Sequence, residues 1–206
     1  MARDRAARPE ARPLRLFVAV DMPDDIRNGL AGAVEPLRDD VPGARWTRPD
    51  AWHVTMKFLG GVYPRLRQRV EGAAAEAASA AEPFATRLTE LGAFPSPRRA
   101  RVLWAGLEDP DGRFAELARA LDGLLQPEFA PEKRPFTPHL TLARFKEQAP
   151  IPEGSLAVHV ASEAFPVDRL VLYRSHLQRP AAWYEPLASF PLGTLGERPR
   201  RGSPRA

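Results

Sequence analysis

The spacing of apolar positions along the chain predicts short strands that alternate with amphipathic helices. Apolar residues recur at helical intervals in residues 23–37 and 113–125, and residues 64–81 are rich in alanine and begin with a proline, so we expect helices in all three segments. Shorter runs, either apolar or alternating with polar residues, predict strands at 15–20, 46–47, 51–59, 84–91, 101–107, 156–161, 167–173 and 183–189. Gly60-Gly61 is typical of a turn that ends the third of these strands. No linker separates independent domains, and the mixture of elements predicts an α+β fold.

Two short motifs share one pattern in this chain. HVTM at residues 53–56 and HLTL at residues 139–142 each combine a histidine, an apolar residue, a threonine and a second apolar residue. In a strand, the histidine and threonine point to one face and the two apolar residues to the other. Each motif is therefore predicted to bury one face and to present an imidazole and a hydroxyl on the other. The repeat indicates a site built from two histidines.

The residue types in the motifs indicate proton-transfer chemistry on an anionic substrate. Histidine titrates near neutral pH, and a threonine hydroxyl can donate a hydrogen bond to an anionic oxygen. Two such strands at one site would bring together His53 and His139 as general acid and base, with Thr55 and Thr141 as hydroxyl donors. This set suits hydrolysis of a phosphodiester without a metal. We expect no metal site, because Asp50 has the opposite parity to His53 and no cysteine is available.

Other polar and aromatic residues are weaker candidates for the site. His159 and His176 fit neither motif, and we interpret both as structural or surface residues. Lys57 has the parity of His53, although a solvated lysine is the simpler interpretation. Aromatic residues in strands usually belong to the core, but three could instead stack on a nucleobase: Trp46, Phe94 and Trp104.

Composition indicates the cellular environment of the protein more clearly than the partners that it binds. The 206 residues include no cysteine and no apolar run of membrane-spanning length, so we expect a cytoplasmic protein without disulfides or membrane contact. The two ends are rich in Arg and Pro: residues 1–15 and 197–206 carry +3 each, and the rest of the chain carries −2, which gives the net charge of +4. We expect disordered basic tails at 1–13 and 194–206 around one domain at 14–193, acting as a monomer.

Five segments of the chain, taken together, resemble a known family. RLFVAVDMP, PDAWHVTMKFLG, RRARVLWAGL, RPFTPHLTLAR and LVLYRSHLQRP occur in this order. They are similar to segments of the RNA 2',3'-cyclic phosphodiesterases, also called the 2'-5' RNA ligase family, within the 2H phosphoesterase superfamily. The resemblance covers residues 14–193 and leaves out the two tails. It implies a bilobal α+β fold, in which two antiparallel-sheet lobes with outer helices each contribute one motif to a central cleft.

The resemblance also implies roles for individual residues. His53 would be the general acid that protonates the departing 3'-oxygen, and His139 the general base that activates water. Thr55 and Thr141 would contact the phosphate, and Arg144 matches a basic residue often found after the second motif. In an ideal strand Arg144 would point away from His139, unless the strand ends or bulges there. The two motifs are nearly equivalent, so the residues alone do not order acid and base.

The activity implied by the resemblance is hydrolysis of RNA 2',3'-cyclic phosphate ends to 2'-phosphates without a cofactor, with 2'-5' RNA ligation as its reverse. The residues leave two alternatives open. One keeps the chemistry but takes a small cyclic nucleotide or a 2'-5' linked nucleotide as substrate. The other is a protein that binds RNA ends without turnover.

Overall fold

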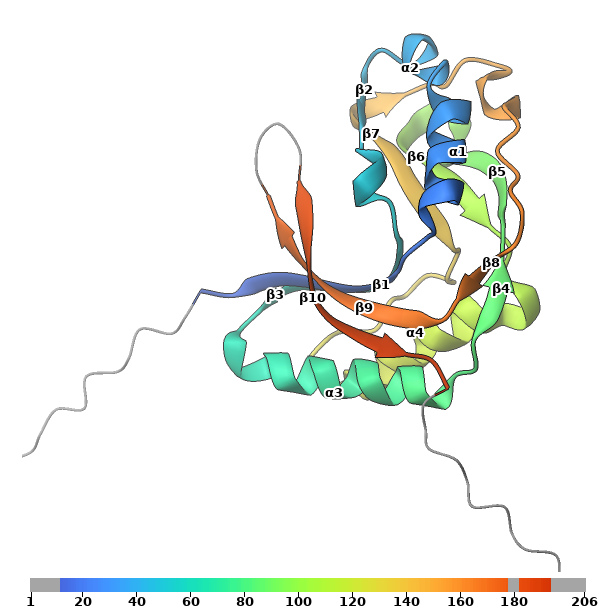
Figure 1. The fold of residues 1–206 in the computed structure, drawn as a ribbon. Coiled ribbons are helices and arrows are strands. Elements are labelled where there is room, and N and C mark those ends of the chain that lie inside the picture. The colour runs from blue at the N-terminus through green and yellow to red at the C-terminus, as the bar shows by residue number, and fades with distance from the viewer. Residues whose placement is uncertain (1–11, 178–181, 194–206) are drawn as a thin grey trace, which may run out of the picture.

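The computed structural model describes residues 12–177 and 182–193, which form an α+β fold around one large antiparallel sheet (Figure 1). Its strands are β1 (Leu14–Val20), β2 (Ala44–Trp46), β3 (Val54–Val62), β5 (Leu88–Phe94), β6 (Ala100–Leu107), β7 (His139–Ala149), β9 (Arg169–His176) and β10 (Trp183–Pro191). A separate small sheet pairs β4 (Phe84–Thr86) with β8 (Phe165–Val167). The tails predicted at 1–13 and 194–206 lie outside the described residues, except for residues 12 and 13.

The large sheet has two halves that meet at one residue pair. Strands β10, β9, β1 and β3 form the first half, and β7, β6 and β5, with β2 beside β7, form the second. Between them, β3 and β7 pair only at Val54 and Leu140. In Figure 1 the first half crosses the lower part of the molecule and the second rises above it. This arrangement agrees with the two antiparallel lobes that the family resemblance implies.

The helices pack on the sheet much as their apolar stripes predict. They are α1 (Asp24–Val34), α2 (Leu37–Asp40), α3 (Pro64–Ala80) and α4 (Arg113–Leu124). Helix α3 contacts β9 and β10, α4 contacts β3, and the two helices contact each other. The helices predicted at 64–81 and 113–125 are confirmed, whereas the one at 23–37 is divided at Pro36, which cannot donate to a helical carbonyl. None of the helices in the described ranges has the length and apolarity needed to cross a membrane.

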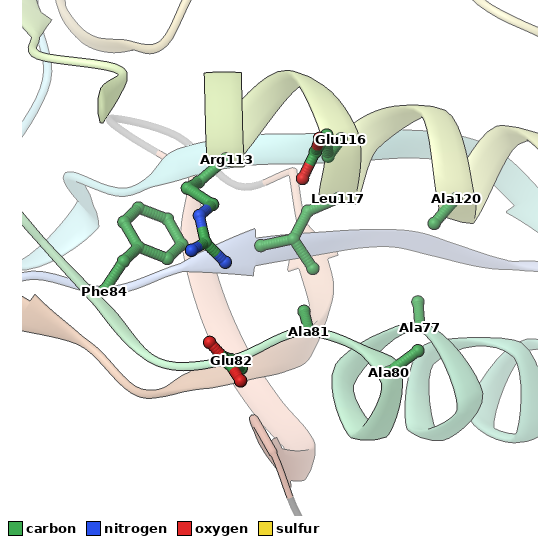
Figure 2. A pocket seen from close by; sticks show the side chains of 9 residues that line it. All are labelled: Ala77, Ala80, Ala81, Glu82, Phe84, Arg113, Glu116, Leu117 and Ala120. Atoms are coloured by element: carbon green, nitrogen blue, oxygen red, sulfur yellow. The ribbon is translucent and has the colours of Figure 1, made fainter. Parts of the chain in front are cut away.

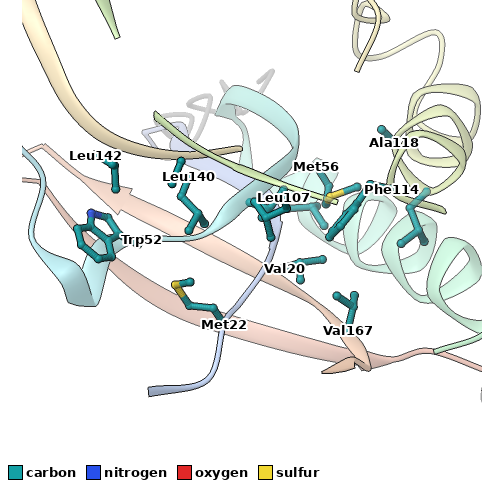
Figure 3. Packing of buried hydrophobic residues seen from close by; sticks show 14 of the residues in the cluster. Val20, Met22, Trp52, Met56, Leu107, Phe114, Ala118, Leu140, Leu142 and Val167 are labelled. Carbon is teal, nitrogen blue, oxygen red and sulfur yellow. The ribbon is translucent and has the colours of Figure 1, made fainter. Parts of the chain in front are cut away.

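The apolar residues of both motifs lie in the core between the sheet and the helices (Figure 3). Met56 of β3 and Leu140 and Leu142 of β7 are buried there, together with Phe114 of α4. Burying a side chain of this size contributes about 1.5–3 kcal/mol. Each motif is thus fixed through its apolar face, as the alternation predicts, and its histidine and threonine are left on the other face.

The predicted turn at Gly60-Gly61 is wrong, because β3 continues through both glycines to Val62. Gly60 has a φ of 69° and lies at a register shift against β1. Glycine adopts this left-handed conformation at little cost, so here it accommodates an irregularity within the strand instead of ending it.

Two further strand predictions differ from the structure. The segment predicted at 84–91 is divided between β4, which pairs with β8, and β5, which pairs with β6. The segment predicted at 156–161 is not a strand: residues Ser155–Ala157 form a short 3-10 turn, and residues 158–161 pair with no strand of the described chain. Val160 is nevertheless buried. The alternating pattern reports burial of one side of a segment and carries no information about hydrogen bonding to a neighbour.

Candidate active site

The contact between β3 and β7 brings the two motifs together on one face of the sheet. The residues that follow the two histidines pair with each other. If this antiparallel register is continued by one residue in each direction, His53 falls opposite Thr141 and Thr55 opposite His139. Residues opposite each other on antiparallel strands point to the same side. All four side chains therefore share the side of the sheet away from the core, which we call the histidine face.

Each imidazole is held in the same way by a backbone carbonyl two residues earlier. His53 Nδ1 donates to the Ala51 oxygen at 2.9 Å, and His139 Nδ1 donates to the Thr137 oxygen at 2.7 Å. A carbonyl only accepts, so Nδ1 carries the hydrogen and the neutral ring has its lone pair at Nε2. Neither Nε2 has a hydrogen-bond partner within residues 12–177 and 182–193. Both rings thus present an unoccupied nitrogen for proton transfer.

A β-bulge follows the threonine of each motif. The pairing register shifts by one residue after Thr55 in β3 and after Thr141 in β7. Each extra residue reverses the alternation of side chains beyond it. The fifth residue after each histidine therefore returns to the histidine face, as Phe58 in β3 and Arg144 in β7, and both are exposed. The bulge is what allows Arg144 to share a face with His139.

The same bulge turns Lys57 away from the histidine face. Its side chain is only 6% exposed, and Nζ donates to the Asp122 carboxylate of α4 and, at 2.6 Å, to the Ala130 carbonyl. Asp122 also accepts a hydrogen bond of 3.0 Å from the Glu132 backbone N–H. Both interpretations of Lys57, as a neighbour of His53 and as a solvated lysine, are wrong. Lys57 thus connects the first motif strand to α4 through Asp122, and to the loop that leads to the second motif through Ala130.

Aromatic residues from three strands surround His53. Phe17 stacks on the imidazole with ring centroids 4.6 Å apart, Tyr184 meets it edge-on at 5.1 Å, and Tyr173 lies at 6.2 Å. The Tyr173 hydroxyl in turn donates to the Asp21 carboxylate at 2.7 Å. Our sequence analysis did not single out these residues. Their strands were predicted. Which residues of β1, β9 and β10 lie on the same face as His53, however, depends on pairing between distant segments.

Two aromatic residues of the second half lie beside His139. Phe94 meets its ring edge-on at 5.1 Å, and Trp104 lies at 6.4 Å. Trp104 covers Gly92, where an added Cβ would come within 2.1 Å of the indole. Trp46, by contrast, pairs with a buried alanine of β7 and belongs to the core side. Of the three aromatic residues that could stack on a nucleobase, only Phe94 and Trp104 therefore lie beside a motif histidine.

Burial and positive charge keep both imidazoles neutral. Burial, together with a smaller contribution from the charge of Arg144, lowers the pKa of His53 to about 4, against the opposing effect of the hydrogen bond to the Ala51 carbonyl. Burial also lowers the pKa of His139, with further contributions from the charges of Arg144 and Arg134. His139 itself acts on His53. Both rings and Arg144 therefore lie within electrostatic reach of one another, and an anion placed among them would favour protonation.

The remaining candidates from the sequence lie elsewhere. His176 stacks on Trp183 with ring centroids 3.9 Å apart and hydrogen bonds to Glu185 at 2.8 Å, so it has a structural role in the β9–β10 hairpin. His159 is exposed, and Asp50 forms an ion pair with a neighbouring arginine. Within the described part of the chain, no three His, Asp or Glu side chains gather closely enough to hold a metal ion.

A cavity of about 320 Å³ lies between α3 and α4 (Figure 2). Its floor is apolar, with Ala77 and Leu117, and its charged groups are Glu82, Arg113 and Glu116. The helices that form it pack against the core side of the sheet, away from the histidine face. The cavity is therefore separate from the candidate active site.

Comparisons with known proteins all indicate the same family. A family profile described as the 2'-5' RNA ligase superfamily matches residues 22–179. An RNA 2',3'-cyclic phosphodiesterase of Geobacillus stearothermophilus is 32% identical over 85% of this chain, which spans only 56% of that relative. One of Bacillus subtilis is 30% identical, with 89% of this chain and 99% of the relative covered. The crystal structure of Escherichia coli LigT complexed with 3'-AMP is 27% identical and has a TM-score of 0.71, covering 87% of this chain and 98% of LigT.

Proposed function

The chain belongs to the 2'-5' RNA ligase superfamily, and on that basis we propose that it hydrolyses RNA 2',3'-cyclic phosphate ends to 2'-phosphates with its two motif histidines as acid and base. The observation that carries the proposal is the pair of unoccupied Nε2 atoms on one face, at the point where the two motif strands pair. Relatives named as RNA 2',3'-cyclic phosphodiesterases support the choice of substrate.

The reaction uses one imidazole on each side of the phosphorus. His139 Nε2 takes a proton from water while the water oxygen attacks phosphorus, and the bond from phosphorus to the 3'-oxygen breaks. His53 Nε2 gives its proton to that departing oxygen, which leaves a 3'-hydroxyl and a 2'-phosphate. Solvent then returns both rings to their starting protonation. The order of acid and base follows the family pattern, since the geometry of the two motifs is nearly symmetric.

The polar groups around the histidines suit the charge that develops on the phosphate. The Thr55 and Thr141 hydroxyls are without a hydrogen-bond partner in the described chain and would donate to the two non-bridging oxygens. Arg144 would offset the added negative charge of the transition state, because its charge already acts on both imidazoles. The proposed mechanism assigns proton transfer to histidine and charge to these donors, so it uses neither a metal nor a cofactor.

The negative charge of the bound substrate favours the protonated form that the acid needs, and the proton itself comes from solvent. A histidine whose pKa is about 4 is neutral at pH 7, and so is His139 with its lowered pKa. The cyclic phosphate carries one negative charge, which raises the pKa of an adjacent imidazole. The substrate therefore promotes protonation of the acid only when it is in place.

The same attack with an RNA 5'-hydroxyl in place of water would form a 2'-5' linkage, because the phosphorus retains its 2'-oxygen and loses the 3'-oxygen. Hydrolysis and 2'-5' ligation are thus two outcomes of one mechanism that differ only in the nucleophile. We include ligation in the proposal for this reason.

The proposal is tested by incubating the protein with a cyclic-phosphate-ended oligoribonucleotide and with a nucleoside 2',3'-cyclic phosphate, each followed by phosphorus NMR. We expect a 2'-phosphate product, and we expect His53→Ala and His139→Ala each to lower turnover by roughly 10² to 10⁴. His159→Ala, an exposed histidine far from either motif in the sequence, is the matched control. If the protein hydrolyses neither substrate, the alternative of a protein that binds RNA ends without turnover is favoured. Full turnover by either motif variant would exclude the two-histidine mechanism.

A further inference from the structure

A second arginine lies next to Arg144 on the histidine face. Strand β2 runs along the edge of β7, and its central residue Arg45 pairs directly with Arg144. Directly opposed residues of antiparallel strands share a face, so both guanidinium groups project on the side of His139. Both arginines are exposed, and neither has an ion-pair or hydrogen-bond partner in the described ranges.

This pair of like charges is unfavourable in the isolated protein. Like charges directly opposite on neighbouring strands destabilise a sheet, and no carboxylate offsets either of these. Arg87, another exposed arginine, does pair with an acidic residue, Glu108. The next residue in the same row across the sheet is Val102 of β6, which contributes no charge. Two neighbouring positive charges without a carboxylate partner suit a ligand that carries more than one negative charge.

The two arginines differ in their distance from the reacting centre. The charge of Arg144 lowers the pKa of both histidines, whereas Arg45 is not among the groups that act on either. Arg45 therefore lies one strand spacing, about 4.8 Å, from Arg144, on the edge of β7 that also meets β3. A ligand that extends from the histidines past Arg144 would meet it next.

We propose that Arg45 binds the backbone phosphate adjacent to the reacting one, and so selects an RNA strand over a mononucleotide as substrate. This inference rests on the proposed function and refines its substrate class. An arginine contact to phosphate positions a strand without reading its sequence, so selection would depend on the presence of a second phosphate and not on base identity. A nucleoside 2',3'-cyclic phosphate has no such group and would gain nothing from Arg45.

The test compares kcat/KM of Arg45→Ala on two substrates: a hexaribonucleotide with a 2',3'-cyclic phosphate end, and the matching nucleoside 2',3'-cyclic phosphate. We expect a loss of about tenfold on the hexamer, the size of one charge-assisted contact, and no change on the mononucleotide. The dependence of hexamer KM on salt should also become shallower, by about 0.7 in the logarithmic slope. Arg119→Ala removes an exposed arginine of α4, on the core side of the sheet, and is the matched control.

The outcomes separate this inference from the proposed function. An equal loss on both substrates would place Arg45 at the reacting phosphate, and no loss on the hexamer would exclude the contact; either result overturns the inference. If the wild type hydrolyses neither substrate, the proposed function fails, and the inference is judged by fluorescence anisotropy with a labelled hexamer ending in a 2'-phosphate. Binding weakened about tenfold in Arg45→Ala but not in Arg119→Ala would support it, and unchanged binding would overturn it.

Discussion

Burial of a neutral His53 should make the protein less stable in acid, by an amount that one substitution can isolate. The unfolded chain binds a proton at the ordinary histidine pKa of 6.5, whereas the folded chain binds it only at about 4. Between these values the unfolded state carries more protons, so its population rises as pH falls. The interval of roughly two and a half pH units corresponds to about 3 kcal/mol of stability, present above pH 6.5 and lost by about pH 4.

The assay is urea denaturation of the wild type and of His53→Asn at intervals from pH 7.5 to 4. An asparagine amide can still donate to the Ala51 carbonyl, but it does not titrate. Carboxylates that titrate over the same range contribute equally to both proteins and cancel in the difference. We expect the wild type to lose about 3 kcal/mol more than His53→Asn over this range. His159→Asn replaces an exposed histidine in the same way and is the matched control.

Parallel pH profiles of the wild type and His53→Asn would contradict this reasoning. They would mean that His53 is as easily protonated in the folded protein as in the unfolded chain. The aromatic enclosure by Phe17, Tyr173 and Tyr184 would then not exclude water from the ring.

Three further predictions follow from the site and its supports. The pH dependence of kcat/KM should be bell-shaped with its maximum below pH 6.5, since this parameter reports the free enzyme and the pKa values of both His53 and His139 are lowered; a maximum at pH 7 or above would contradict the assignment. Lys57→Met should lower the free energy of unfolding by about 3 kcal/mol in urea denaturation at pH 7, because it leaves the Asp122 carboxylate without its partner; a change under about 0.5 kcal/mol would show that the pair is dispensable. Activity should survive excess EDTA, and a loss that a divalent ion restores would require a metal in the mechanism.

The sequence predicted secondary structure and the buried faces well where burial alone decides them. The helix at 113–125 and the inward apolar residues of both motifs follow from periodicity, the helix at 64–81 follows from its alanine content, and all are found in the structure. Predictions failed where hydrogen-bond partners decide the outcome. Residues 156–161 alternate like a strand, yet the structure gives them no strand partner among the described residues.

The site was only partly predictable for a related reason. Parity placed the histidines and threonines on one face, but the bulges after Thr55 and Thr141 are properties of pairing between strands far apart in sequence. They decide that Arg144 faces the site and that Lys57 does not. Arg45 shows the same limit, since nothing in its own segment indicates that Arg144 lies opposite.

The claim that two histidines act as acid and base is tested most directly by changing the leaving group. A 2',3'-cyclic substrate with sulfur in place of the 3'-oxygen releases a thiolate, which needs less protonation than an alkoxide. The account predicts that this substrate restores the rate of His53→Ala far more than that of His139→Ala, because only the first variant lacks the acid. Greater rescue of His139→Ala would exchange the two roles, and equal rescue of both variants would show that neither imidazole protonates the departing atom, which would contradict the mechanism.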